Sequence, residues 1–256
     1  MSIYAEEPDR EGARPAPNAA AFAPQADDVF GRIAKRYDLL SDVFSLGIHR
    51  LWKRRVAKVM ARESWSTLLD GATGTGDIIL RVLAHDATQG RKIIAADISP
   101  QMLAIAAKRL AGHGERVELR RLNAESMPEV PDNSLDAYSL SLCLKICNRQ
   151  LALQEARRVL KPGGRLLILE ASNIRRRWLH RVYLAYMSLC MPALGWLATG
   201  GDASAYRYLL QGIREFPSAE ALAEELRQAG FVGVQFEQLS LGIVAIHLAR
   251  KPGDSK

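Results

Sequence analysis

The residues most capable of chemistry form a glycine-rich turn, Asp70-Gly71-Ala72-Thr73-Gly74-Thr75-Gly76-Asp77. Glycines let a backbone turn tightly and approach a ligand where a Cβ would clash. Asp97 follows Gly76 by 21 residues, at the end of an apolar run, where a carboxylate can accept hydrogen bonds from both hydroxyls of a ribose. The turn and this acid together predict a nucleoside pocket.

The kind of nucleoside follows from the composition of the turn. It lacks the GxGxxG spacing of a dinucleotide site and the GK[ST] ending of a P-loop. Asp70 precedes the turn and Asp77 closes it, and two acids favour a cationic ligand over a phosphate. S-adenosylmethionine carries an ammonium and a sulfonium, so we expect it as the cofactor.

Strands and helices that alternate along the chain must position these residues. Apolar runs predict strands, and apolar residues at helical spacing predict the helices between them. The expected strands are 67–70, 92–97, 117–122, 135–142 and 165–170, and the expected helices are 78–84, 100–110 and 151–160. This alternation predicts an α/β fold with a Rossmann-like, doubly wound, mostly parallel sheet, which places ligands at the carboxyl ends of its strands.

The flanking segments complete a single expected domain over residues 27–256. Residues 1–26 are rich in proline and small polar residues, which predicts a disordered tail, and 27–62 shows the pattern of an N-terminal helical cap. Residues 173–210 interrupt the alternation, and 182–201 are 20 residues without a charge. We interpret this insertion as an apolar lid that dips into a membrane interface, although core packing explains part of it. A helix over 218–229 then leads into strands 232–239 and 243–249, an expected antiparallel C-terminal hairpin at the sheet edge.

Composition narrows the class of protein. Of 256 residues, 48% are hydrophobic and 25% charged, which is typical of a globular protein. Cys143, Cys147 and Cys190 form no disulfide framework and no zinc spacing, so we expect core thiols and no metal. The start of the chain lacks the pattern of a signal peptide, which predicts a cytoplasmic protein. The net charge of +7 suggests a phosphate-bearing partner such as a nucleic acid, an anionic membrane or a charged small molecule.

Several separated motifs resemble known methyltransferases. The turn 70–77, Ala96-Asp97-Ile98, Asn123-Ala124-Glu125 and the run 158–165 resemble class I S-adenosylmethionine-dependent methyltransferases. More narrowly, the chain resembles the ubiquinone/menaquinone biosynthesis C-methyltransferase family over roughly residues 27–250. This resemblance is carried by Tyr37-Asp38, the run 45–52, Leu169-Glu170-Ala171-Ser172 and the run 205–209.

The resemblance implies roles for the cofactor residues. Gly74, Thr75 and Gly76 are expected to line the methionine portion, and Asp97 to hold the ribose. Asp70 would orient the loop or meet the ammonium through water. The other residues expected at the cofactor are Gly71, Ile98, Asn123 and Ala124.

Two segments depart from the family pattern and leave the acceptor open. The run 142–148 stands where quinone methyltransferases typically show Gly-Leu-Arg-Asn, so it lacks the usual arginine and gains two cysteines. We therefore consider Lys145 and Asn148 as candidate substrate residues. The second segment, Arg175-Arg176-Arg177, has three readings, namely a solvated basic face, an anchor on an anionic membrane, or a site for a diphosphate.

Methylation at carbon requires an activated nucleophile. In a prenylated quinol, a base that removes the ring hydroxyl proton activates the ortho carbon, and Glu170 or His49 is the candidate base. Both residues also have ordinary structural interpretations, as a helix-terminus partner and a cap. Tyr37, Tyr206 and Arg207 are candidates for orienting the acceptor.

Other acceptors stay open as alternatives. In a prenyl diphosphate such as farnesyl diphosphate, the alkene would attack the methyl group directly, with cyclisation as a further outcome. Arg175 and Arg176 would hold the diphosphate, and the Trp178 ring would stabilise the cation. An RNA methyltransferase and an inactive cofactor-binding regulator are less favoured. We thus expect a small isoprenoid partner and no nucleic acid, and leave peripheral membrane contact and a homodimer open.

Overall fold

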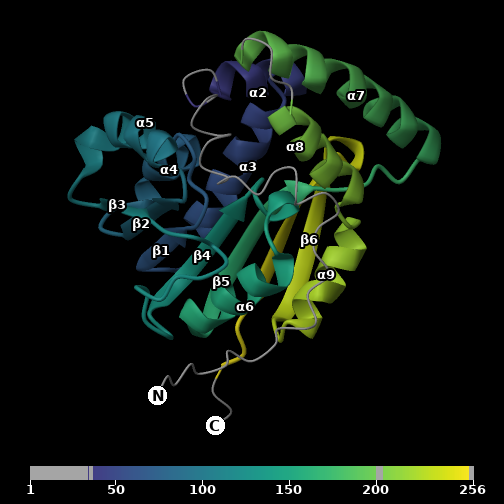
Figure 1. Ribbon diagram of the computed structural model, residues 1–256. Coiled ribbons are helices and arrows are strands. Elements are labelled where there is room, and N and C mark those ends of the chain that lie inside the picture. Colours follow the sequence, from purple (N-terminus) through teal and green to yellow (C-terminus); the bar gives the residue numbers. More distant parts are fainter. Residues whose placement is uncertain (1–33, 35–36, 200–203, 254–256) are drawn as a thin grey trace, which may run out of the picture.

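A seven-stranded sheet forms the centre of the protein in the computed structural model, which describes residues 34, 37–199 and 204–253 (Figure 1). The strands are β1 (Thr67–Asp70), β2 (Lys92–Asp97), β3 (Val117–Arg121), β4 (Leu135–Ser141), β5 (Leu160–Ala171), β6 (Val232–Leu239) and β7 (Val244–Arg250). Their order across the sheet is β3-β2-β1-β4-β5-β7-β6, and β7 runs antiparallel to both of its neighbours. The other pairs are parallel. The predicted Rossmann-like fold and its C-terminal hairpin are confirmed, with β6 at the edge.

Helices cover both faces of the sheet. They are α2 (Tyr37–Ser45), α3 (His49–Arg62), α4 (Asp77–Leu83), α5 (Pro100–Leu110), α6 (Arg149–Val159), α7 (Arg177–Thr199), α8 (Ser204–Glu215) and α9 (Ala219–Gln228). One buried apolar cluster packs α3, α4 and α5 against the sheet, and a second packs α6 and α9 against the opposite face. The sheet is therefore buried on both sides, as its nearly continuous apolar strands require.

Local sequence signals define where the helices begin. Ser99 caps α5 by accepting a hydrogen bond from the Met102 amide, and Pro100 occupies the first helical position, where no amide hydrogen is needed. Asn148 and Ser218 cap α6 and α9 in the same way. These capping residues follow strands or short connections and therefore define the first residue of each helix.

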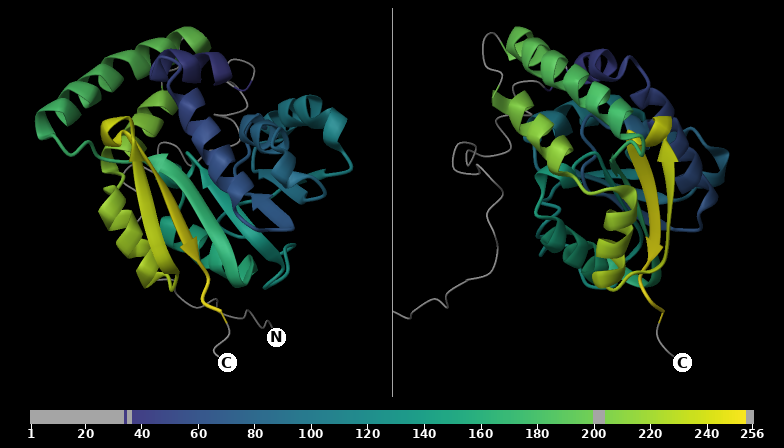
Figure 2. Two further views of the ribbon diagram at one scale, coloured as in Figure 1. Left: turned by 180° about the vertical axis from the view of Figure 1, so that it is seen from behind. Right: turned by 90° about the vertical axis from the view of Figure 1, so that its right-hand side faces the viewer.

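A third apolar cluster lies beyond the carboxyl ends of the strands. It joins three helices that are distant in sequence, because Leu40 comes from α2, Met187 and Met191 from α7, and Tyr206 and Leu210 from α8. Figures 1 and 2 show α2, α7 and α8 together over this end of the sheet. Ligands of doubly wound sheets bind at this end.

Some element boundaries differ from the predictions. Strand β5 begins at Leu160 rather than Arg165, because the chain pairs with β4 immediately after α6. The expected lid contains α7, which is continuous through Pro192, and part of α8. In the part of the chain that the structure describes, no helix has the length and apolar character needed to cross a membrane. The predicted tail, 1–26, lies outside the described residues.

Candidate functional site

The glycine-rich turn connects the end of β1 to α4 with backbone angles that favour glycine. Gly74 and Gly76 have φ values of 55° and 80°, in the left-handed region. A Cβ added to Gly71 would lie 2.4 Å from the hydroxyl of Tyr138 in β4. The first glycine is thus needed for close packing against the sheet, whereas the space around Gly74 is open.

A cavity of about 130 Å³ lies beside this turn. The Asp97 carboxylate at its wall is fixed by two backbone amides, because Oδ2 accepts from Gly74 N at 2.8 Å and Oδ1 from Ser99 N at 2.9 Å. This cavity contains most of the predicted cofactor residues, at the carboxyl ends of β1 and β2. Its walls include Gly71, Ala72, Gly74, Asp97, Ile98, Met102, Leu122, Asn123 and Ala124.

The buried carboxylate of Asp70 lies at the end of β1, next to the turn, and does not line the cavity. Its Oδ1 accepts a hydrogen bond from Ser139 Oγ at 2.6 Å, while its buried Oδ2 has no partner among the described residues. Burial raises the pKa of Asp70 to about 6. A positive group nearby would favour its ionised form, so the residues fit a cofactor that carries an ammonium.

Two residues at the end of the turn face away from this cavity. Thr75 Oγ1 donates to Asp38 Oδ1 at 3.1 Å and accepts from Arg109 at 2.9 Å, and Gly76 packs beside Leu110 of α5. The structure therefore does not bring Thr75 and Gly76 to the cavity wall.

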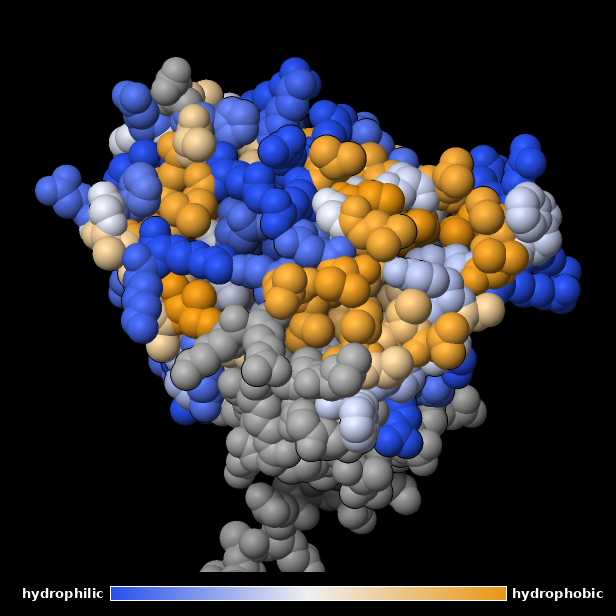
Figure 3. All heavy atoms as spheres, turned by 90° about the horizontal axis from the view of Figure 1, so that it is seen from above, coloured by the Kyte–Doolittle hydropathy of each residue, from blue (hydrophilic) through white to orange (hydrophobic). Residues whose placement is uncertain are grey.

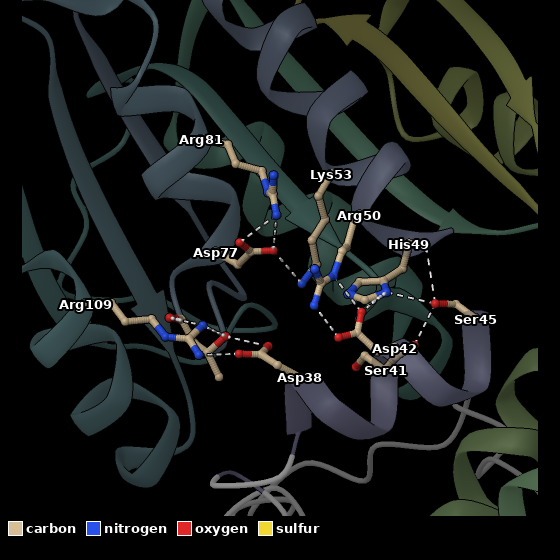
Figure 4. Close-up of polar contacts among 11 residues, drawn as sticks. Asp38, Ser41, Asp42, Ser45, His49, Arg50, Lys53, Asp77, Arg81 and Arg109 are labelled. Carbon is tan, nitrogen blue, oxygen red and sulfur yellow. Dashed lines mark hydrogen bonds and ion pairs between the residues drawn. The ribbon is translucent and has the colours of Figure 1, made fainter. Parts of the chain in front are cut away.

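The charge of Asp77 is engaged within the protein. Lys53 Nζ and an Arg81 nitrogen each lie 3.1 Å from its carboxylate (Figure 4). These two cations lower the pKa of Asp77. Two protein cations already balance the charge of Asp77, which stabilises the contact between α3 and α4, so this acid gives no further support to the expected cationic ligand.

A second, larger cavity adjoins the first. It measures about 340 Å³ and has mainly apolar walls. Tyr37 and Leu142 line both cavities and so mark where they meet. Leu142 has a φ of 58°, which is strained for a branched side chain, and its carbonyl accepts a hydrogen bond from the Lys145 ammonium. The apolar walls include Leu40, Phe44, Leu46, Ile48, Met187, Met191, Leu209 and Ile213.

His49 lies in the wall of this second cavity with a defined tautomer. Ser45 Oγ donates its hydrogen to the Ser41 carbonyl at 2.6 Å, so the 2.8 Å contact between Ser45 Oγ and His49 Nδ1 requires the hydrogen on Nδ1 (Figure 4). The lone pair then belongs to Nε2. Burial and the Lys53 ammonium lower the pKa of His49, which favours the neutral ring. A neutral imidazole with a lone pair on Nε2 can accept a proton.

Lys145 and Glu170 form a buried ion pair in the same cavity, with Nζ and Oε1 3.2 Å apart. The two Glu170 oxygens also accept from the amides of Lys145 and Ala171. The segment that departs from the family pattern therefore still presents a cation to the cavity. Because three donors engage Glu170, its geometry suits holding Lys145 better than accepting a proton.

Tyr37 and Tyr206 supply two further polar groups of the cavity. Burial, with Asp97 and Asp38 nearby, raises the pKa of Tyr37 to about 12, so this residue stays a phenol. Tyr206 is 2% exposed, and its hydroxyl has no hydrogen-bond partner among the described residues. Its ring packs against Phe44 with centroids 5.4 Å apart. This hydroxyl is a buried hydrogen-bond donor on a residue that lines the cavity.

The structure does not bring the remaining predicted substrate residues to this cavity. Asn148 caps α6, where its Oδ1 accepts from the Leu151 amide at 3.2 Å. The other predicted residues, Arg175, Arg176, Trp178 and Arg207, are exposed and absent from the cavity wall.

Cys143 belongs to the buried core, as predicted, and Cys147 packs against it. Both residues also line the first cavity, which sequence reasoning did not predict. Leu40 and Phe44 of α2 follow Tyr37 at helical spacing, and this pattern would have identified one wall of the second cavity.

Comparisons with known proteins show which chains this one is similar to. The ubiquinone/menaquinone biosynthesis C-methyltransferase UbiE of Rhizobium meliloti is 41% identical over 232 residues, which cover 88% of each chain. The protein of the same name from Hahella chejuensis is 37% identical over 226 residues, covering 87% of this chain and 90% of that relative.

Solved structures and a family match complete the comparison. A SAM-dependent methyltransferase from Thermotoga maritima has a TM-score of 0.63 and 21% identity, and covers 89% of this chain and all of its own. An O-methyltransferase family protein from Burkholderia thailandensis has a TM-score of 0.60 and 19% identity, over 93% of this chain and 70% of that one. These two likenesses show the fold. Residues 20–251 match the ubiE/COQ5 methyltransferase family, and the chain therefore belongs to that family.

Proposed function

We propose that this protein is an S-adenosylmethionine-dependent C-methyltransferase that methylates a ring carbon of a prenylated benzoquinol or naphthoquinol in quinone biosynthesis. The observation that carries the proposal is the junction at Tyr37 and Leu142 of a cofactor cavity and a larger apolar cavity. Methyl transfer is an in-line displacement, so a donor and an acceptor held in adjoining cavities satisfy its main requirement. The curated relatives carry the name of this activity.

The cofactor cavity would hold S-adenosylmethionine through residues of β1 and β2. Asp97 is fixed at the wall by the Gly74 and Ser99 amides and would accept hydrogen bonds from the ribose. The unpartnered Oδ2 of Asp70 suits the ammonium, directly or through water. When bound, this cofactor supplies an electrophilic methyl group on a sulfonium.

His49 would act as the base. A quinol carbon becomes nucleophilic when the adjacent ring hydroxyl loses its proton. The Nε2 lone pair of the neutral His49 ring would take that proton, and the contact between Nδ1 and Ser45 keeps the tautomer fixed. Asp42, 3.7 Å from Nδ1, would stabilise the imidazolium that forms.

The other polar groups would orient the acceptor. The Tyr206 hydroxyl would donate to one ring oxygen. The Lys145 ammonium, held by Glu170, would lie beside the developing phenolate. An isoprenoid tail would occupy the apolar wall formed by α2, α7 and α8.

The prenyl diphosphate alternative has less support in the cavity. A diphosphate needs several cations, and guanidinium groups are best suited to bind it. Lys145 is already paired with Glu170, while Arg175, Arg176 and Arg207 are exposed outside the cavity wall. The quinol therefore agrees better with the charges present.

The test supplies methyl-labelled S-adenosylmethionine with either a demethylated prenyl quinol or farnesyl diphosphate, and identifies the lipid products by mass spectrometry. We expect label on a ring carbon of the quinol. His49→Asn should lower the rate about 100-fold or more, whereas His113→Asn, outside both cavities, should not change it. Label in farnesyl diphosphate alone would overturn the assignment of the acceptor.

A further inference from the structure

Helix α7 is apolar on two opposite faces, of which one has no protein partner among the described residues. Its inner face packs Met187 and Met191 against α2 and α8. Its outer face carries a row of exposed residues at spacings of three and four, which we call the outer stripe. The stripe consists of Trp178, Val182, Ala185, Leu189, Ala193 and Trp196.

The outer stripe is long and strongly exposed. Leu189 is 74% exposed and Val182 is 58% exposed. The distance along the helix from Trp178 to Trp196 is about 27 Å at 1.5 Å per residue. A tryptophan lies at each end, and this residue favours the boundary between water and lipid because its ring is apolar and its N–H is polar.

Exposed apolar residues also surround the entrance to the acceptor cavity. Leu46, Ile48 and Tyr186 line the cavity and are also exposed, with Leu46 at 75%. Leu39 and Val43 extend the apolar surface along α2, which packs beside α7. Apolar side chains gather on this face of the molecule, which Figure 3 shows from above. The stripe and the entrance thus belong to one surface.

The charges within the segment that carries the outer stripe have one sign. The sequence contains no Asp or Glu from Ala171 to Gly201. Arg175, Arg176, Arg177 and Arg181 are all exposed near the start of α7. Arginine side chains close to an anionic membrane are attracted to its lipid headgroups. An apolar helix face bordered by such residues is typical of a helix that lies in a membrane interface.

We propose that the outer stripe and the adjoining arginines dock the protein on an anionic lipid bilayer, so that the acceptor enters its cavity directly from the membrane. This inference rests on the proposed function, because it takes the acceptor to be a prenylated lipid. Helix α7 would lie along the interface with its inner face still packed on α2 and α8.

The experiment separates docking from catalysis. Full-length protein is sedimented with vesicles of phosphatidylcholine containing 30% phosphatidylglycerol, and with vesicles of phosphatidylcholine alone. We expect the anionic vesicles to bind it more tightly, and Val182→Glu/Leu189→Glu to weaken binding at least tenfold. The matched control, Leu151→Glu/Val232→Glu, changes two residues that are 45% and 50% exposed on α6 and β6, and should bind like the unaltered protein. Arg177→Gln/Arg181→Gln should weaken binding by about fivefold per arginine and make it less sensitive to salt.

Two activity measurements complete the test. With a short-chain, water-soluble quinol, Val182→Glu/Leu189→Glu should keep the unaltered rate, whereas with a long-chain quinol in anionic vesicles its rate should fall with its binding. If the unaltered protein methylated neither the short-chain nor the long-chain quinol, this result would contradict the proposed function rather than the docking.

Other occupants of the stripe give different results. Absence of vesicle binding, or equal weakening by the control pair, would overturn the docking proposal. A dimer that Val182→Glu/Leu189→Glu dissociates, seen by analytical ultracentrifugation in a protein that does not bind vesicles, would assign the stripe to a second copy.

Discussion

The hydroxyl of Tyr206 allows one substitution to test the acceptor site through stability and through activity. Tyr206→Phe keeps the ring that packs on Phe44 and removes a buried hydroxyl without a partner among the described residues. Burying such a group costs about 1–3 kcal/mol. We expect the substitution to increase the free energy of unfolding of the ligand-free protein by about 1–2 kcal/mol, which corresponds to a Tm about 2–8 °C higher.

The same substitution should impair the reaction. In the complex, an oxygen of the quinol would lose its donor and remain buried, so kcat/KM for the acceptor should fall about tenfold. The Kd for S-adenosylmethionine should not change, because Tyr206 does not line the cofactor cavity. Differential scanning calorimetry, initial rates with labelled cofactor and titration calorimetry measure these three quantities.

A second tyrosine provides the control for the stability effect. Tyr138 in β4 also has a buried hydroxyl without a partner among the described residues, and it lies outside the acceptor cavity. Tyr138→Phe should raise the Tm without changing KM for the acceptor. A lower Tm in Tyr206→Phe, or an unchanged kcat/KM, would refute the assignment of this hydroxyl to the acceptor.

Five further substitutions test the other polar groups. The rate of methyl transfer should fall as the pH drops through the pKa of His49, which is lowered below 6.5, because protonation removes the base. His49→Asn should abolish this acid limb of the pH–rate profile. Lys145→Met leaves Glu170 buried without its cation and should cost about 3–5 kcal/mol in urea unfolding, and adding Glu170→Gln should recover most of this loss. Asp38→Asn should raise the Kd for S-adenosylmethionine about fivefold in titration calorimetry, because it frees the cofactor turn from α2. Arg109→Gln should raise this Kd by the same factor. The double variant should show little further loss of affinity.

Local sequence predicted the fold and the cofactor cavity because both depend on short-range patterns. A strand, a glycine-rich turn and an acid at the next strand end place Gly74 and Asp97 together in any parallel sheet of this kind. The same pattern does not say which way each side chain of the turn points. Thr75 was therefore predicted at the cofactor, although its hydroxyl faces Asp38 and Arg109.

The acceptor cavity depends on contacts that sequence spacing does not reveal. Its walls come from α2, α7 and α8, which meet only when the chain has folded. The exposed arginines at the start of α7 are an example. Their sequence shows a cluster of positive charge, but it does not show whether the side chains face the cavity or the solvent. The sequence suggests Tyr206 as a residue that orients the acceptor, but only the structure shows that its hydroxyl has no hydrogen-bond partner among the described residues.

Helix α2 connects the two cavities mechanically. Tyr37 lines both of them, Leu40 and Phe44 line the acceptor cavity, and the intervening Asp38 bonds to Thr75 in the cofactor turn. The helix that forms a wall for the acceptor is therefore tied to the loop that would hold the donor. We expect a change in the position of that loop to shift α2, because the hydrogen bond between Thr75 and Asp38 joins the two segments. Asp38→Asn should accordingly weaken acceptor binding as well as cofactor binding, although Asp38 does not line the acceptor cavity.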